Sequence, residues 1–178
     1  AFLERLVKTI AVVAGVVAVI AVLQWITTVF SENALFLPPV NGRIGSTFGN
    51  AAFLAGYLGM SLFVILLVLR DAVGVWRRVY SASAVLSVFA ILLAATRGTI
   101  LALILTGTVA LAYAAWRGEE RMKSGARYGL IALVIVAGFF FAFRGQLAHA
   151  PFEPVRRIAS ISLSDDTVAS RLFVWRNV

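Results

Sequence analysis

The sequence has no cysteine, one histidine and few charged residues. The absence of cysteine excludes a disulfide framework and a thiolate metal site within these 178 residues. A single histidine, His149, leaves no histidine-based metal cluster to assemble, and the acidic residues show no paired spacing typical of metal binding. Charged residues make up 13% of the chain, about half the fraction of an average soluble domain. These absences point away from a soluble domain and from a metal cofactor.

The chain is instead rich in long apolar runs, and 61% of its residues are hydrophobic. A membrane-spanning helix needs about 20 apolar residues, because the hydrocarbon core is about 30 Å thick. The stretch from Val79 to Trp116 is too long for one span, and its only charge is Arg97. We expect a turn at "ATRGT", where a charge and Gly98 allow the backbone to reverse. The sequence therefore predicts an all-α polytopic membrane protein with five spans, over residues 9–30, 51–69, 79–95, 98–116 and 128–143.

The net charge of +8 is distributed between these runs rather than over a soluble face, which argues against nucleic acid as a partner. Cytoplasmic loops of membrane proteins carry an excess of Lys and Arg. Nine basic residues fall on one side of the predicted spans: Arg5, Lys8, Arg70, Arg77, Arg78, Arg117, Arg121, Lys123 and Arg127. The short loops on the other side hold only Arg43 and Arg97. We therefore expect a cytoplasmic N-terminus, with residues 31–50, the Arg97 turn and residues 144–178 outside.

The two ends of the chain suggest a piece of a longer protein. The sequence starts at Ala1 without Met, and "RLFVWRNV" is typical of the opening of an element rather than its close. We expect residues 1–143 to form a transmembrane helical bundle and residues 144–178 to begin a large periplasmic loop, with the C-terminal part of the parent protein missing.

The loop before the second span contains "RIGSTFGN". Asn50 is placed to cap the next helix, whose start offers free N–H groups and partial positive charge. With Arg43 nearby, this is a candidate anion site, and an ordinary capped loop is the alternative.

Arg97 has two interpretations. It is either an interfacial arginine at a hairpin tip or a phosphate clamp, because a guanidinium matches phosphate oxygens two at a time. Arg171 lies in "DDTVASRLFVWRNV", which is typical either of an amphipathic helix along the membrane surface or, more simply, of a solvated surface helix. His149 is either a general base or, more simply, an incidental loop residue.

Three segments, in this order, resemble segments of the O-antigen ligase and O-antigen polymerase-like membrane proteins. "RIGSTFGNAAFLAGYL" resembles that family's Arg-x-x-Gly-Thr-Phe-Gly-Asn-x-Asn-x-Leu-Ala-x-Tyr-Leu segment, although Ala52 stands where the family has its second Asn. "AATRGTILAL" resembles its Ser/Thr-Arg-Gly segment, and "SRLFVWRNV" resembles its Arg-Leu-x-x-Trp segment. The similarity runs from about residue 38 to the end of the chain.

The resemblance implies a larger helical bundle of the lipid-linked-sugar glycosyltransferase type in the bacterial inner membrane. Such a protein moves a glycan from undecaprenyl pyrophosphate to lipid A–core on the periplasmic face, without metal or other cofactor. Arg97, Arg171 and Arg43 match family arginines thought to bind the pyrophosphate, and Asn50, near Arg43 in the sequence, is the fourth candidate substrate-binding residue. The family's catalytic histidine is expected downstream of Val178, so no catalytic residue is assigned here and the piece alone should be inactive.

Several alternatives stay open at this point. A polysaccharide polymerase of the same family would take another glycan as acceptor. A carrier of an anionic lipid-linked sugar is disfavoured, because none of the predicted spans has a charged residue in its interior. A non-catalytic membrane scaffold is the third possibility.

Overall fold

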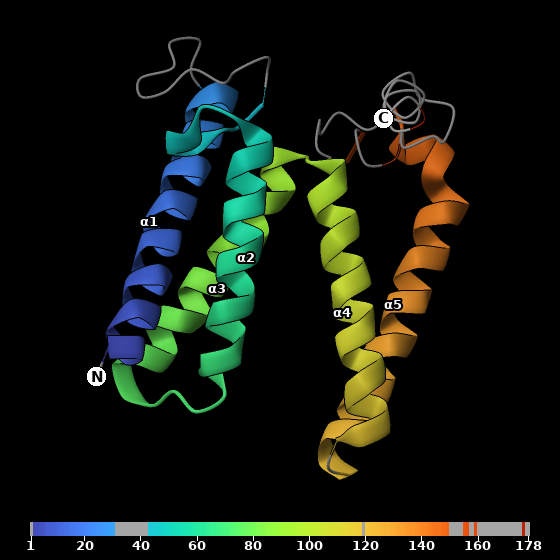
Figure 1. Ribbon diagram of the computed structural model, residues 1–178. Coiled ribbons are helices and arrows are strands. Elements are labelled where there is room, and N and C mark those ends of the chain that lie inside the picture. The colour runs from blue at the N-terminus through green and yellow to red at the C-terminus, as the bar shows by residue number, and fades with distance from the viewer. Residues whose placement is uncertain are drawn as a thin grey trace. The chain divides into compact units, whose positions relative to one another are not determined.

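The structure, a computed structural model, describes residues 2–30, 43–118, 120–149, 155–156, 159 and 176. Within these ranges the regular structure is helical and contains no strand. The elements are α1 (Phe2–Phe30), the short 3-10 helix η1 (Ser46–Phe48), α2 (Ala51–Leu69), α3 (Gly74–Ala94), α4 (Arg97–Arg117) and α5 (Glu120–Leu147) (Figure 1). The five long helices are each long and apolar enough to cross a membrane. The prediction of an all-α chain with five such helices is confirmed.

Most helices are longer than the spans expected from the apolar runs. Helix α2 covers the predicted range, whereas α1 begins at Phe2 and α5 extends from Glu120 to Leu147. The physical reason is that the length of an apolar run matches the thickness of the hydrocarbon core, whereas the helix itself continues beyond that core into turns with charged residues. Arg5 and Lys8 therefore lie on α1 itself.

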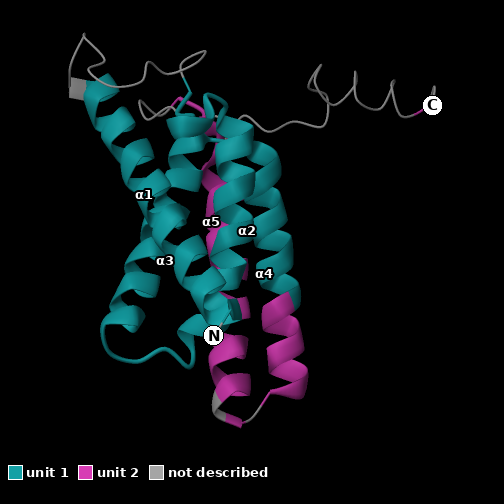
Figure 2. Cartoon of the chain, turned by 60° about the vertical axis from the view of Figure 1, so that its left-hand side comes forward, with its two compact units in different colours: residues 1–109 teal, residues 110–178 magenta. Residues whose placement is uncertain are grey.

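The chain forms two compact units, residues 1–109 and residues 110–178 (Figure 2). In the first unit, α3 packs against both α1 and α2, and α1 also contacts α2. The face that α1 buries consists mostly of small side chains, and several of the residues that α3 buries are also small. These are Ala11, Ala14, Ala18 and Ala21 on α1, and Ser83, Ala84, Ser87, Ala90 and Ala94 on α3. Small residues let helix backbones approach closely where lipid leaves no hydrophobic drive between helices.

Gly15 is the tightest point of this packing. A Cβ atom built on Gly15 would lie 2.6 Å from the hydroxyl oxygen of Ser83. Further along the same two helices, the rings of Trp25 on α1 and Phe89 on α3 meet edge to face, with their centroids 6.1 Å apart. The glycine on α1 is thus explained by its neighbour on α3 rather than by backbone conformation.

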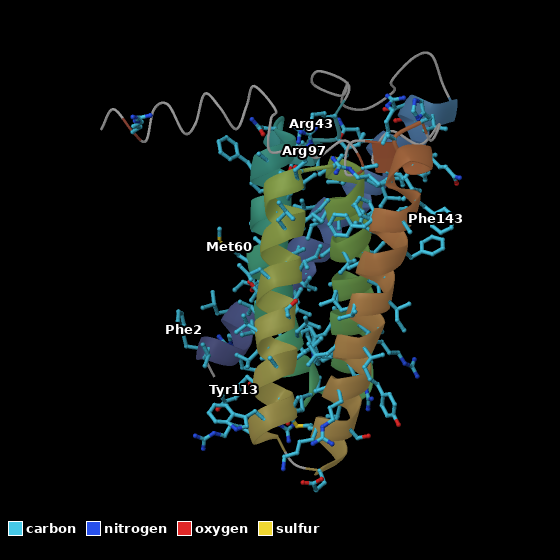
Figure 3. The ribbon with its side chains drawn as sticks, turned by 90° about the vertical axis from the view of Figure 1, so that its right-hand side faces the viewer. Phe2, Arg43, Met60, Arg97, Tyr113 and Phe143 are labelled. Atoms are coloured by element: carbon cyan, nitrogen blue, oxygen red, sulfur yellow. The ribbon has the colours of Figure 1, made fainter. Side chains whose placement is uncertain are left out.

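The helices of the first unit run alternately up and down, so their starts and ends gather at two opposite ends of the unit. Arg43 and Arg97 lie at one end, and Phe2 lies at the other (Figure 3). The Phe2 end also holds the beginning of α1, the end of α2 and the beginning of α3, with Lys8, Arg70 and Arg77. The start of α1 and the connection between α2 and α3 therefore lie at the same end of this unit, as the distribution of basic residues predicted.

In the second unit, the end of α4 approaches α5. A Cβ atom built on Gly129 would lie 3.1 Å from a methyl carbon of Leu111. Most apolar side chains of α4 and α5 are exposed, which is the pattern of helices whose surroundings are themselves apolar. Glu120 and Lys123 form an ion pair of 2.8 Å at the start of α5, and this partner lowers the pKa of Glu120.

Candidate functional site

Residues 43–50 pack into one end of the first unit, and part of this segment is buried there. Ile44 and Ser46 are buried, and so is Gln24 of α1, with 3% of its surface exposed. The amide oxygen of Gln24 accepts hydrogen bonds from the backbone N–H groups of Ser46 and Gly45, at 2.8 Å and 3.2 Å. The Ser46 hydroxyl donates to the carbonyl oxygen of Val17 at 2.9 Å. Non-helical backbone buried in a membrane protein needs such internal partners.

Two glycines make this segment possible. A Cβ atom on Gly45 would lie 2.8 Å from the backbone nitrogen of Asn50, so only glycine fits there. Gly49 has φ of 63°, in the left-handed region that favours glycine. The segment closes on itself through these two residues, and this closure brings Arg43 and Asn50 to the same end of the unit.

Asn50 is the N-cap of α2, as predicted. Its side-chain oxygen accepts a hydrogen bond from the backbone N–H of Ala52 at 2.8 Å, and its own backbone is extended. The cap satisfies one of the N–H groups at the start of α2. The other amides of the first turn have no partner within the helix, and they give this end a partial positive charge.

The break between α3 and α4 falls at Ala95 and Thr96, and Arg97 is the first residue of α4. We expected Gly98 to allow the turn, but the left-handed residue is Ala95, with φ of 48°, and Gly98 is helical. The backbone N–H of Ile100 bonds to the Thr96 carbonyl at 3.1 Å, which starts the helix directly after the corner. The correction places the half-buried Arg97 at a helix start rather than on a loop.

Arg43 contacts the corner between α3 and α4, and Thr96 of that corner contacts the start of α2. Its Nη2 atom donates to the carbonyl oxygen of Ala94 at 3.3 Å and to the Thr96 hydroxyl at 3.1 Å. The Thr96 hydroxyl in turn donates to the carbonyl oxygen of Ala51 at 3.2 Å. The structure therefore gathers Arg43, Asn50 and Arg97 at one corner, where α2 and α4 both begin.

The described residues of the corner contribute positive charge by composition and by geometry. The sequence places no Asp or Glu in residues 43–50 or 94–99. Two arginines and two helix N-termini act in the same direction, and each helix start contributes about half an elementary positive charge. Such an arrangement attracts an anion that presents several oxygens, such as a phosphate or a pyrophosphate.

A groove between α2 and α4 begins beside this corner. Its volume is about 290 Å³, and its lining is mostly apolar and small. It is lined by Gly56, Gly59, Met60 and Phe63 of α2 and by Gly98, Thr99, Ala102, Leu103 and Thr106 of α4. Gly98 and Thr99 belong to the first turn of α4, so the groove runs from the charged corner along two helices that are able to span a membrane.

A larger cavity, of about 580 Å³, lies at the opposite end of the first unit. It is lined by parts of α1, α2 and α3, and Lys8 contacts both Glu4, at 2.5 Å, and the ring of Trp76, at 4.7 Å from its centre. Its charged lining residues are of both signs, Glu4 and Asp71 with Lys8. We place the candidate site at the arginine corner, because charge of one sign converges only there among these two cavities and their surroundings.

The remaining sequence-based candidates are elsewhere or undescribed. Arg171 lies outside the described residues. His149 follows α5, where its Nδ1 atom is 2.9 Å from the carbonyl oxygen of Gly145, a contact that caps the end of the helix. The described residues contain no group of three or more His, Cys, Asp or Glu able to hold a metal ion.

Two residues of the site, Gln24 and Thr96, were not predicted from the sequence. Gln24 is the only amide side chain within the first apolar run, and that isolation was the available hint. Thr96 precedes Arg97 in the "ATRGT" segment, but its bonds to Arg43 and Ala51 cross about 50 positions of sequence.

Searches against family models, curated proteins and solved structures found no match to this chain.

Proposed function

We propose that this chain is the donor-binding part of a membrane glycosyltransferase of the O-antigen ligase type. Its donor is a glycan linked to undecaprenyl pyrophosphate, and its acceptor is a hydroxyl group of lipid A–core. The observation that carries the proposal is the corner where Arg43, Arg97 and the starts of α2 and α4 converge. Arg43 and Arg97 come from two of the three resembling sequence segments, and their placement at one corner supports the proposal.

The chemistry of the donor fits this corner. In glycan transfer, the acceptor oxygen forms a bond to the anomeric carbon while the bond from that carbon to the pyrophosphate oxygen breaks. Negative charge then collects on the leaving undecaprenyl pyrophosphate. Arg97 and Arg43 stabilise that charge most strongly where water is scarce, and positioned donors of this kind lower a barrier without a metal ion. The acceptor's proton passes to a base that the family resemblance places after Val178.

The groove beside Arg97 supports the lipid character of the donor. A polyprenyl chain is an apolar tail, and the groove between α2 and α4 is apolar and adjoins the arginine corner. A headgroup at Arg97 would place the first isoprene units against Gly98 and Thr99. Glycines in the wall, at Gly56 and Gly59, leave room for such a chain.

In this proposal the arginine corner faces the periplasm of a Gram-negative cell. The basic residues at the Phe2 end of the first unit, among them Lys8, Arg70 and Arg77, favour the cytoplasm for that end. Because the chain lacks cysteine, single cysteines report topology without background. We expect a membrane-impermeant maleimide to label Thr47→Cys from the periplasm and Arg78→Cys only after the membrane is opened.

The decisive experiment measures surface glycan transfer by the full-length parent in a strain that lacks its own ligase. Arg97→Lys keeps the charge but loses the two-pronged fork of donors. We expect transfer to fall roughly tenfold to a hundredfold, the range that corresponds to loss of a charged hydrogen bond. Arg78→Lys, the same change at the other end of the unit, should leave transfer unchanged. Full activity of Arg97→Lys at normal abundance would refute the clamp.

A further inference from the structure

We infer that Thr96 is a positioning residue of this site. Its hydroxyl holds Arg43 and the start of α2 against the start of α4, so that both arginines present their charge to one ligand. The identity of the ligand rests on the proposed function, whereas the contacts made by Thr96 stand without it.

The hydrogen-bonding capacity of Thr96 matches this role. A hydroxyl has one proton to donate and two lone pairs to accept with. The Thr96 hydroxyl accepts from Arg43 Nη2 at 3.1 Å and donates to the Ala51 carbonyl at 3.2 Å. The Ala94 carbonyl, at 3.4 Å, is the longer alternative acceptor for the same proton. One side chain thus links the start of α2 to the segment that carries Arg43.

Arg43 depends on this corner for its orientation. An arginine side chain has many rotamers, and fixing it requires partners at its guanidinium. Nη2 has two such partners, the Thr96 hydroxyl and the Ala94 carbonyl. The Ala94 carbonyl belongs to the last residue of α3 and has no partner within its helix. The Ala94 carbonyl and the Thr96 hydroxyl are neutral, so these two hydrogen bonds orient Nη2 without bringing a negative charge to it.

Arg97 is coupled to the same hydroxyl through the chain. It follows Thr96 directly, and the Thr96 carbonyl accepts the first N–H bond of α4, from Ile100. The position of Thr96 therefore sets where α4 begins relative to α2. Loss of the hydroxyl releases Arg43 directly and loosens the register between the two helix starts.

The matched variants are Thr96→Val, Thr96→Ser and Thr108→Val. Valine has nearly the shape of threonine without the hydroxyl, and serine restores the hydroxyl. Thr108 lies on α4 with its hydroxyl 2.7 Å from the Ile104 carbonyl, so Thr108→Val removes a comparable hydrogen bond away from the site. Differences between Thr96→Val and Thr108→Val report the position and not the type of change.

The first measurement does not depend on transferase activity. Ser46 is 2% exposed, so Ser46→Cys provides a thiol that is protected while residues 43–50 are docked. We expect Thr96→Val to raise the rate of maleimide labelling at this cysteine roughly fivefold, the factor for loss of one hydrogen bond. Thr96→Ser and Thr108→Val should leave the rate near its original value. Arg43→Gln should raise it as Thr96→Val does, which provides a second variant if Thr96→Val folds poorly.

The second measurement follows glycan transfer by the full-length parent at several donor concentrations. Thr96→Val should raise the KM for donor about fivefold to tenfold with a smaller change in kcat, and Thr96→Ser should restore it. In an Arg43→Gln background the effect of Thr96→Val should become much smaller, because only the hydrogen bond to the Ala51 carbonyl is then left to lose. Thr108→Val should have no effect in either background.

The outcomes separate this inference from the proposed function. If the wild-type parent transfers no glycan but Thr96→Val exposes the cysteine at position 46, the function fails and the positioning role stands. If the parent is active while Thr96→Val changes neither labelling nor KM, the positioning role is overturned. An undiminished effect of Thr96→Val in the Arg43→Gln background would overturn it as well.

Discussion

The side-chain oxygen of Gln24 lies 2.8 Å from the backbone nitrogen of Ser46, and this contact anchors the segment that carries Arg43 to α1. The same oxygen also accepts from the backbone N–H of Gly45. A single amide side chain, buried in an otherwise apolar helix, thereby satisfies the N–H groups of Gly45, which precedes η1, and of Ser46, its first residue. Its removal leaves both groups buried and without an acceptor.

Gln24→Met keeps the size of the side chain and removes its oxygen. We expect the free energy of unfolding to fall by about 2 kcal/mol, because two buried N–H groups each lose a hydrogen bond. The measurement is an unfolding titration with sodium dodecyl sulfate in mixed micelles. Gln146→Met on α5 is the control, since Gln146 is exposed. Equal stability of the two variants would show that the Gln24 contacts contribute nothing.

The sequence predicted the helices well and the site only in part. Four apolar runs located all five helices, because the thickness of a membrane limits the length of a span and the longest run exceeds that limit. The N-cap at Asn50 was also predictable, because capping depends on a residue and its next few neighbours. These features are local, and a single sequence contains them.

The contacts that assemble the site are not local. Gln24 is 22 positions from Ser46, and Arg43 is 53 positions from Thr96. No pattern within either segment specifies the other. The position of the turn illustrates the same limit: glycine is the usual left-handed residue, and the sequence offered Gly98, yet Ala95 takes that conformation. The turn at Ala95 also lies between two residues that Arg43 contacts, Ala94 and Thr96.

Gly15 and Ser83 form a pair whose energies we expect to be coupled. Gly15→Ala places a Cβ atom 2.6 Å from the Ser83 hydroxyl, which must rotate away. We expect a loss of about 1 kcal/mol in the free energy of unfolding. Ser83→Ala removes the obstructing oxygen, so the double variant should recover most of that loss. Gly107→Ala, where an added Cβ atom meets nothing within 4 Å, should be neutral or stabilising. Simple additivity of Gly15→Ala and Ser83→Ala would contradict the clash.

Ala95 is held in the left-handed region, with φ of 48° and ψ of 39°. That conformation costs an L-residue about 1–2 kcal/mol, and glycine adopts it freely. Ala95→Gly should therefore raise the free energy of unfolding by about 1 kcal/mol. Ala112→Gly, in an exposed helical position of α4, should lower it by about the same amount. Changes of the same sign in the two variants, in a micelle unfolding titration, would mean that the corner has a different backbone.

Substitutions of Asn50 can distinguish helix capping from anion binding. Asn50→Asp and Asn50→Ser both retain a side-chain oxygen able to accept from Ala52 N–H, so both should preserve the stability of α2 within about 0.5 kcal/mol. Aspartate, however, adds a negative charge at the corner shared with Arg43 and Arg97, where an incoming pyrophosphate would meet it. We expect glycan transfer by the full-length parent to fall at least roughly tenfold in Asn50→Asp, since like charges at contact cost more than 1 kcal/mol where water is scarce. Asn50→Ser should retain most of its activity. If both variants are equally active, no anion binds at this corner, even if the helix is properly capped.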